Sequence, residues 1–292
     1  MPSTRDIRRR IRSVKNTAQI TKAMQMVASS KMRKAQLAAL AGRPYAQQMN
    51  SMLADATAKA GDFTHPLMES RSGHRTAVIL VSTDKGLCGA LNSNLFREAG
   101  KLATESTVFV CAGKKGAQFI TRTRRKLVAE FTYKDAPLFS EARALSRFVR
   151  ELFLKGEVDR VDVLFTDFVS TLVQKPEWRT LLPVGVIKGV QAGVGPGESP
   201  AVLQNSGMEF QFEPTAQQVL GELLPHALNF EIYQILLEAK ASEHSSRMVA
   251  MKNATDNAKQ LIKDLTLEYN KLRQANITKE LLEITTAQMA LG

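Results

Sequence analysis

Residues 251–272 read MKNATDNAKQLIKDLTLEYNKL, and this stretch decides the fold. It lies within the run from His226 to Leu291, which contains neither glycine nor proline. In a helix interior, glycine costs about 1 kcal/mol and proline about 3 kcal/mol relative to alanine, so a run without them predicts one continuous helix. At about 1.5 Å of rise per residue, that helix would be roughly 100 Å long. We expect a helix of this length to stand clear of its own domain and to lie along another helix or another protein.

The other end of the chain predicts a matching helix. No glycine or proline occurs from Ser3 to Ala41, and Ser3 followed by Asp6 is typical of a helix N-cap. Narrow apolar stripes run along both terminal segments, which favours a two-helix antiparallel coiled coil. The first stripe is Ile7, Ile11, Val14 and Ala18, drifting through Ile20, Met24, Val27, Met32 and Ala35; the second is Met251, Ala254, Ala258, Leu261, Leu265, Tyr269 and Leu272.

Positive charge is concentrated in the first helix. Residues 1–43 hold eleven basic side chains and one acidic side chain, so they carry +10 of the chain's net charge of +12. Residues 226–292 hold eight of each kind and are neutral. A helix this basic can bind nucleic-acid phosphates, anionic lipid headgroups or an acidic protein surface. The alternative is a solvated face without a partner, which would usually contain acids as well.

The middle of the chain predicts a Rossmann-like α/β domain. Short apolar runs rich in β-branched residues alternate with helical patterns, as in a mostly parallel sheet. We therefore expect a coiled-coil helix over 1–60, an α/β domain over 70–215 and a second coiled-coil helix over 216–292. The expected strands are Thr76–Ser82, Thr107–Ala112, Val161–Thr166, Arg179–Ile187 and Met208–Phe212; the expected helices between strands are Asn92–Thr104, Lys114–Thr123 and Glu141–Lys155; and Lys188–Gly207 is expected to be a surface loop.

Catalytic and ligand-binding motifs are weak in this sequence. No Gly-x4-Gly-Lys-Ser/Thr phosphate loop is present. The loop Asp84–Gly89 follows a strand and precedes a helix, where open α/β sheets often bind ligands, although a tight connection between the two elements explains it more simply. The four histidines are scattered and complete no Ser/His/Asp or Cys/His set. We expect no catalytic residue, no cofactor and no metal.

Composition limits the class of protein further. No apolar run approaches the length of a membrane span, and the first residues lack the apolar stretch of a signal peptide. We therefore expect a soluble chain that stays in the compartment where it is made. Cys88 and Cys111 fit a reducing interior, in which a structural disulfide is not expected.

Four stretches of the sequence resemble the gamma-subunit family of the F-type ATP synthase. They are Ser13–Thr17 leading into Ile20–Arg33 (ITKAMQMVASSKMR), Asp84–Gly89 (DKGLCG), Arg247–Ala258 (RMVAMKNATDNA) and Tyr269–Leu281 (YNKLRQANITKEL). The similarity covers essentially the whole chain, including the order of helix, α/β domain and helix. One departure is Ala287-Gln288, where the family motif usually ends in Gly-Ala.

The resemblance implies a rotor shaft that is not itself an enzyme. In that family the terminal helices coil together inside a hexameric head of alpha and beta subunits. The α/β domain sits on a membrane ring of c subunits and binds the epsilon subunit, so that ion-driven rotation of the ring drives ATP synthesis. The resemblance also implies a peripheral location on the cytoplasmic side of the bacterial inner membrane, without insertion into the bilayer and without a nucleic-acid partner.

The resemblance implies partner-contacting residues at the neck of the coiled coil. Met24 would face an acidic loop of a beta subunit, and Arg247 would lie close to it. Ordinary coiled-coil packing is the alternative interpretation of Met24.

A second set of implied contacts lies further along the C-terminal helix. Arg273 and Gln274 would hydrogen-bond a catch loop of a beta subunit, and Thr278 and Glu280 would fall in a coupling-sensitive segment just beyond. For Arg273 the alternative is a solvated helix charge.

Two other classes of protein remain open from the sequence alone. The basic first helix could bind nucleic acid like the basic region of a zipper factor, although Ile7, Ile11 and Val14 lie within the basic stretch instead of in a separate zipper. Alternatively, the α/β domain could be a small-molecule enzyme, which predicts activity or a nucleotide-dependent melting shift in the isolated chain.

Overall fold

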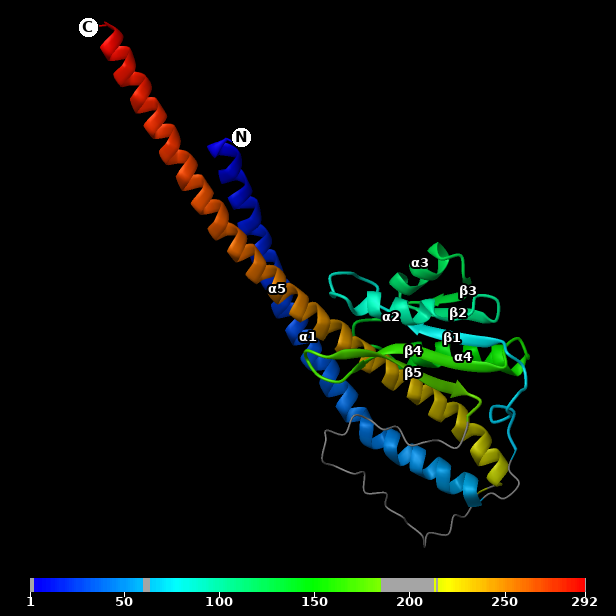
Figure 1. The fold of residues 1–292 in the computed structure, drawn as a ribbon. Helices are drawn as coiled ribbons and strands as arrows, with labels where there is room; N and C mark the ends of the chain where they lie inside the picture. The colour runs from blue at the N-terminus through cyan, green and yellow to red at the C-terminus, as the bar shows by residue number, and fades with distance from the viewer. Residues whose placement is uncertain (1–2, 60–63, 185–212, 214, 292) are drawn as a thin grey trace. The chain divides into compact units, whose positions relative to one another are not determined.

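The fold is known from a computed structural model, which describes residues 3–59, 64–184, 213 and 215–291 (Figure 1). Long helices lie at both ends of the chain, α1 (Thr4–Lys59) and α5 (Ala216–Leu291). Two compact units result: the coiled-coil unit, residues 1–28 and 247–292, and the sheet unit, residues 29–246. The elements between the long helices are β1 (Thr76–Val81), α2 (Leu91–Gly100), β2 (Thr107–Ala112), α3 (Lys114–Arg122), β3 (Lys126–Phe131), α4 (Phe139–Leu154), β4 (Arg160–Phe168) and β5 (Gln174–Leu182).

Over the residues that the structure describes, the sheet has five strands in the order β3-β2-β1-β4-β5. The first four strands of this order pair in parallel, and β5 pairs antiparallel with β4. The chain winds outward from β1 to β3 and then crosses through α4 to β4 on the other side of β1. This is the arrangement of a doubly wound α/β fold, so the predicted fold class is confirmed.

Strand β1 is buried on both of its faces. Ala77, Ile79 and Val81 belong to a core shared with α4 and α5, whereas Val78 and Leu80 belong to a second core shared with α2 and α3. The alternation follows from the two-residue period of a strand. A strand covered on both faces has no polar side to present, which is why the sequence shows it as a continuous apolar run.

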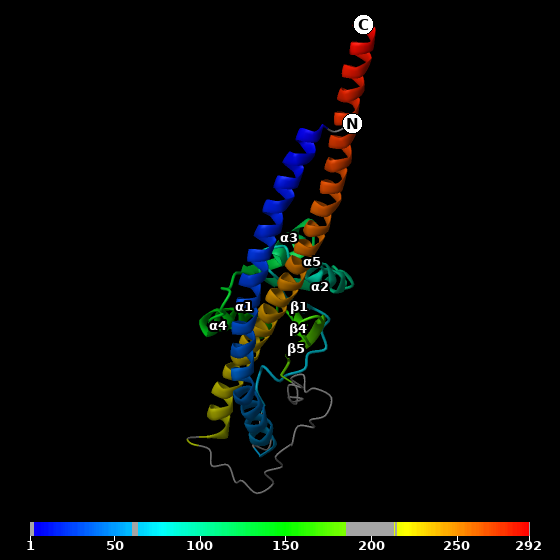
Figure 2. The same ribbon diagram turned by 90° about the vertical axis from the view of Figure 1, so that its left-hand side faces the viewer.

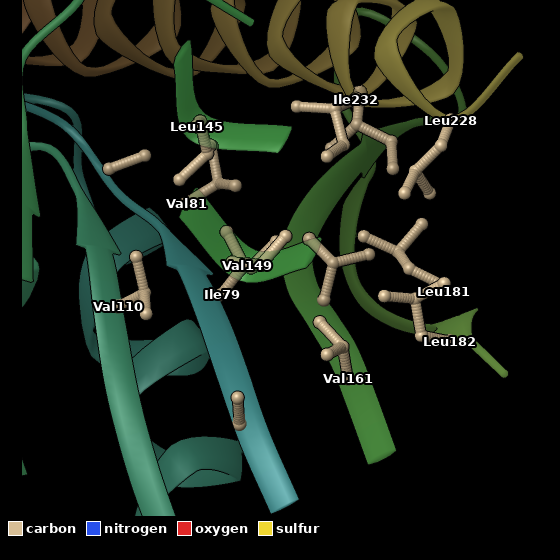
Figure 3. Packing of buried hydrophobic residues seen from close by; sticks show 14 of the residues in the cluster. Ile79, Val81, Val110, Leu145, Val149, Val161, Leu181, Leu182, Leu228 and Ile232 are labelled. Carbon is tan, nitrogen blue, oxygen red and sulfur yellow. The ribbon is translucent and has the colours of Figure 1, made fainter. Parts of the chain in front are cut away.

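Helix α5 supplies part of the first core (Figure 3). Leu228 and Ile232 pack over Leu181 and Leu182 of β5 in the same cluster of buried side chains. A further cluster joins Leu220 and Leu224 of α5 to Met49 and Leu53 of α1. The expectation that the C-terminal helix stands clear of the α/β domain is therefore wrong for residues 216–246, and residues 29–59 of α1 belong to the same compact unit. Freedom from glycine and proline predicts that a helix is continuous, but it carries no information about which turns are buried.

Most predicted elements of the sheet unit are present, and their predicted bounds lie within a few residues of the observed ones. In addition, the structure contains a strand that the sequence pattern did not predict, β3. It is an edge strand whose residues alternate between exposed and half-buried, with Lys126 and Glu130 pointing to solvent. The predicted strand Arg179–Ile187 overlaps β5, but its last three residues lie outside the described residues, as do the predicted loop Lys188–Gly207 and strand Met208–Phe212.

Candidate functional site

The coiled-coil unit pairs the start of α1 with the later part of α5 (Figure 2). Ser3 caps α1: its Oγ accepts a hydrogen bond from the Asp6 N–H at 3.2 Å and donates one to Asp6 Oδ2 at 2.8 Å. The bond that Ser3 Oγ donates, together with one from the Ser3 backbone, lowers the pKa of Asp6. Behind this cap, shielded side chains recur at alternating spacings of four and three, the heptad pattern of a left-handed coiled coil. They are Ile7, Ile11, Val14, Ala18, Thr21, Gln25 and Ala28 on α1, and Met251, Thr255, Ala258, Ile262, Leu265, Tyr269 and Leu272 on α5.

Two polar contacts join the helices and fix their register. The hydroxyl oxygens of Thr21 and Thr255 are 2.8 Å apart, and both side chains are buried. Nearer the N-terminus, Arg8 Nη2 donates a hydrogen bond to the Tyr269 hydroxyl at 2.6 Å. Residue numbers rise along one helix as they fall along the other, so the pair is antiparallel, as predicted. A buried polar pair in an apolar seam favours one register of the two helices. In a shifted register, the Thr21 and Thr255 hydroxyls would be buried against apolar side chains without their mutual hydrogen bond, which costs free energy.

The seam differs in part from the predicted stripes. Ile20 and Val27 are 60 % and 55 % exposed, and their neighbours Thr21 and Ala28 occupy the seam instead. On α5, Leu261 is 42 % exposed, and Ile262 is turned inward. The predicted drift of the first stripe is therefore wrong within the coiled-coil unit, where the seam keeps a strict heptad. The heptad was hard to predict from the sequence, because Thr21 and Ala28 occupy seam positions next to the larger apolar residues Ile20 and Val27.

The seam ends where α1 begins. Since α1 starts at Thr4 and Arg8 contacts Tyr269, α1 provides no facing turn for the end of α5. Every residue from Arg273 to Met289 is exposed. The exposed segment includes large apolar side chains, whose exposed fractions run from 48 % to 83 %: Ile277, Leu281, Leu282, Ile284 and Met289. Apolar side chains gathered on an exposed surface are typical of a site that another protein covers.

Four of the six residues implied by the resemblance lie on this exposed end. They are Arg273, Gln274, Thr278 and Glu280, and Thr278 Oγ1 returns a hydrogen bond to the Gln274 carbonyl at 3.0 Å. Met24 and Arg247 belong to the same unit, and both are half-buried. Partner contact at these six residues remains a prediction.

The carboxyl edge of the sheet is the other place where the sequence suggested a ligand. Here the N-terminus of α3 is satisfied by the chain itself. The Lys114 N–H donates to Asp84 Oδ1 at 2.9 Å, and the Gly116 N–H donates to Ser82 Oγ at 2.7 Å. A Cβ added at Gly113 would lie 2.2 Å from the Ser82 carbonyl oxygen, so the two backbones also approach closely. The backbone donors that would bind a phosphate are thus already used.

Two clusters of charged side chains lie around largely buried basic residues of the sheet unit. In the first, the guanidinium of Arg179 pairs with Glu177 at 2.7 Å and Glu238 at 3.5 Å, and Glu231 lines a small cavity together with Arg179 and Gln234. Burial raises the pKa of Glu231 to about 7, and Glu238 adds to this rise while Arg179 opposes it. The Glu231 carboxyl group therefore titrates near neutral pH.

The second cluster surrounds Lys240, which is 2 % exposed. Its Nζ lies 2.9 Å from Glu243 Oε2, 3.9 Å from Asp135 Oδ1 and 4.5 Å from the centre of the Tyr133 ring. A hydrogen bond from Lys31 lowers the pKa of Asp135. This cluster ties α5 to the segment after β3 and has the character of a structural ion pair.

The two cysteines lie inside the sheet unit. Cys88 and Cys111 are both buried, and burial together with Glu130 raises the pKa of Cys111 to about 12, which suppresses its thiolate. Within the described ranges, no group of three or more His, Cys, Asp or Glu side chains could hold a metal ion. The helices in that same part of the chain are too short or too polar to cross a membrane.

Two serines of α5 were missed by the sequence analysis. Ser245 and Ser246 hydrogen-bond backbone carbonyls in the loops after β4 and β1. Their sequence signal is weak, because two adjacent serines inside a helix are usually solvated.

Comparisons with known proteins agree with this architecture. A family model described as ATP synthase matches residues 3–291. The chain is 51 % identical to the ATP synthase gamma chain of Opitutus terrae over 296 residues, covering 99 % of both chains, and 48 % identical to that of Methylacidiphilum infernorum over 297 residues, covering 100 % of both.

Solved structures show the same fold. The rotor of the Euglena gracilis mitochondrial ATP synthase matches with a TM-score of 0.68 at 19 % identity, covering 94 % of this chain and 98 % of that one. A chain of the Tetrahymena thermophila mitochondrial ATP synthase central stalk and c-ring matches with a TM-score of 0.61 at 25 % identity, covering 80 % and 99 %. With a matching family model and full-length relatives, the chain belongs to the family of ATP synthase gamma chains.

Proposed function

We propose that this chain is the central rotor shaft of an F-type ATP synthase, and that it couples ion-driven rotation of a membrane c-ring to ATP synthesis or hydrolysis in an alpha/beta head. The observation that carries the proposal is the end of α5. From Arg273 to Met289 the helix is exposed and bears large apolar side chains. A membrane does not explain this segment, because it alternates apolar residues with Lys279, Glu280 and Glu283.

The chemistry of the two helices suits a shaft inside a threefold head. Residues 1–43 carry a charge of +10, whereas residues 226–292 are neutral. A pair of unlike helices presents a different face in each direction, so three equivalent catalytic sites around it would meet three different surfaces at any moment. Alternation between the sites requires this asymmetry.

The interface residues would hold the shaft only weakly at each angle. We assign Arg273 and Gln274 to hydrogen bonds with a beta-subunit loop, with Thr278 and Glu280 in the segment beyond. Met24 and Arg247 are assigned to the neck beside an acidic beta-subunit loop. A hydrogen bond that involves a charge contributes about 1.5–3 kcal/mol, enough to favour one angle and still break at each step.

Further partners follow from the same proposal. The sheet unit would contact the c-ring and the epsilon subunit, which would place the chain peripherally on the cytoplasmic side of a bacterial inner membrane. The chain itself would not be catalytic. Support for this assignment comes from the solved relatives, which are described as rotor, central stalk and c-ring assemblies.

Co-purification tests the proposal directly. A tag on this chain should recover alpha and beta subunits, each in threefold excess over it. A chain that purifies alone from cells that express the whole complex would contradict the proposal. Salt-dependent retention on DNA at physiological ionic strength would instead favour a nucleic-acid-binding protein.

A further inference from the structure

Helix α5 is hydrogen-bonded to the sheet unit at its last turn within that unit. Ser245 Oγ donates to the Thr171 carbonyl at 2.7 Å, and Ser246 Oγ donates to the Cys88 carbonyl at 2.6 Å. Ser245 is fully buried, at 0 % exposed, and Ser246 is half-buried. Ser246 is also the last residue of the sheet unit, and α5 continues directly into the coiled-coil unit.

The acceptor in the loop after β1 is held by the loop's own hydrogen bonds. Thr83 Oγ1 donates to the Lys85 carbonyl at 2.8 Å, and Asn92 Nδ2 donates to Thr83 Oγ1 at 2.7 Å. Leu87 adopts a positive φ of 63°, which is uncommon for a leucine and indicates that its surroundings fix this conformation. The Cys88 carbonyl is therefore a rigid acceptor.

The acceptor after β4 is equally constrained. Ser170 and Val173 exchange backbone hydrogen bonds at 3.0 and 3.3 Å across the turn. Gln174 Nε2 donates to the carbonyls of Ser170 and Thr171, both at 3.0 Å. These hydrogen bonds hold the turn closed, so the Thr171 carbonyl is also a rigid acceptor.

The two loops flank the point at which the sheet's winding reverses. Strands β1 and β4 are neighbours there, because the chain leaves β1 in one direction and returns to β4 in the other. Open α/β sheets bind ligands at this crevice. In this chain, Ser245 and Ser246 of α5 hydrogen-bond to the two loops that flank this crevice.

We propose that Ser245 and Ser246 are positioning residues for torque transmission, which latch α5 to the sheet so that it cannot turn about its own axis under load. This inference rests on the proposed rotor function. The apolar contacts of Ile232, Ile235 and Leu236 hold α5 on the sheet, but they have little directional preference. The ion pairs of Glu238 with Arg179 and of Lys240 with Asp135, at 3.5 and 3.9 Å, are longer than the two serine hydrogen bonds. Hydrogen bonds are directional, and two of them to rigid carbonyls fix the rotation of the helix.

The first test measures the latch in the full chain alone. Hydrogen exchange is compared between wild type and the double variant Ser245→Ala, Ser246→Ala. The control is Ser242→Ala, one turn earlier on α5, because the Ser242 hydroxyl is buried and has no hydrogen-bond partner among the described residues. We expect amides 243–250 to exchange at least about tenfold faster in the double variant and at the wild-type rate in the control. Equal exchange in both would overturn the latch.

The second test measures its role in the assembled complex. In reconstituted vesicles, the double variant should pump fewer ions per ATP against a steep opposing gradient, with normal hydrolysis when the gradient is collapsed. A variant that carries Ser245→Ala with Ser246→Thr keeps one hydroxyl, and it should recover part of the number of ions pumped per ATP. Faster exchange with a normal ratio under load would overturn the torque role alone, whereas a wild-type chain that neither assembles nor pumps would overturn the rotor function as well.

Discussion

The hydroxyl pair of Thr21 and Thr255 is the residue-scale feature that most directly specifies the coiled coil. We expect Thr21→Val or Thr255→Val alone to reduce stability by about 0.5–1.5 kcal/mol, because each breaks the buried hydrogen bond between the two hydroxyls. The double valine variant should recover most of this loss, since two methyl groups then meet in an apolar seam. A double-mutant cycle of urea unfolding, followed by far-UV circular dichroism, measures the coupling.

An exposed threonine provides the control for this cycle. Among the described residues, Thr266 Oγ1 bonds to the Ile262 carbonyl of its own helix, at 2.6 Å, and to no residue of α1, so Thr266→Val should show no coupling to Thr21→Val. Strictly additive effects of Thr21→Val and Thr255→Val would show that the pair does not specify register.

Glu231 predicts a pH dependence of stability. Its pKa is about 7 in the folded chain against a reference value of 4.5, so the folded chain binds this proton more tightly. The group's contribution is therefore complete below pH 4.5 and is lost as the pH rises to about 7. Glu231→Gln keeps the site neutral and should be more stable than wild type above pH 7, by at most about 3 kcal/mol.

Urea unfolding from pH 5 to pH 8 checks this prediction. The exposed Glu222→Gln, on the same helix, is the control and should follow wild type at every pH. If the stability difference between Glu231→Gln and wild type does not change with pH, Arg179 and Glu238 must balance the charge in a way that differs from this account.

Arg273 and Gln274 test the assigned interface. Both side chains are exposed, so the double alanine variant should unfold like wild type, within about 0.5 kcal/mol. In the complex it should loosen coupling between ATP hydrolysis and ion pumping. The number of ions pumped per ATP in vesicles is the readout, and a normal ratio would refute the assignment.

At the scale of elements, burial decides what the sequence can reveal. β1 was predictable because both of its faces are covered, so its residues after Thr76 are all apolar. β3 was not, because an edge strand mixes charged and apolar residues. The long helices were predictable from missing glycine and proline, yet α1 continues through Pro44 and α5 through Pro225. A proline costs a helix about 3 kcal/mol, which packing of neighbouring turns can offset.

Two leucine positions on α5 should respond in opposite ways to substitution. Leu265 is buried in the seam, so Leu265→Ala should destabilise the free chain by about 2–3 kcal/mol. Leu281 is exposed beyond the end of the seam, so Leu281→Ala should leave the free chain unchanged but weaken its assembly with partners. Thermal unfolding and co-purification yield, measured on both variants, separate the two roles. A destabilised Leu281→Ala chain would mean that this end of α5 is covered within the chain.

At the scale of the whole molecule, fold and function were predicted from different information. Composition and periodicity indicated two helices around an α/β domain, and the family motifs then implied a rotor. The interface residues at 273–280 came from the motifs alone, and the structure adds that they are exposed. Ser245 and Ser246 could not be predicted, because their partners are backbone carbonyls that only the folded sheet brings near α5.

The central claim is that this chain turns inside a fixed head. It is tested most directly by immobilising the alpha/beta head of the assembled complex and attaching a visible probe to an exposed position of the sheet unit. With ATP supplied, the account predicts continuous rotation in one direction with three pauses in each turn. A probe that stays fixed while the head hydrolyses ATP at its normal rate would contradict it.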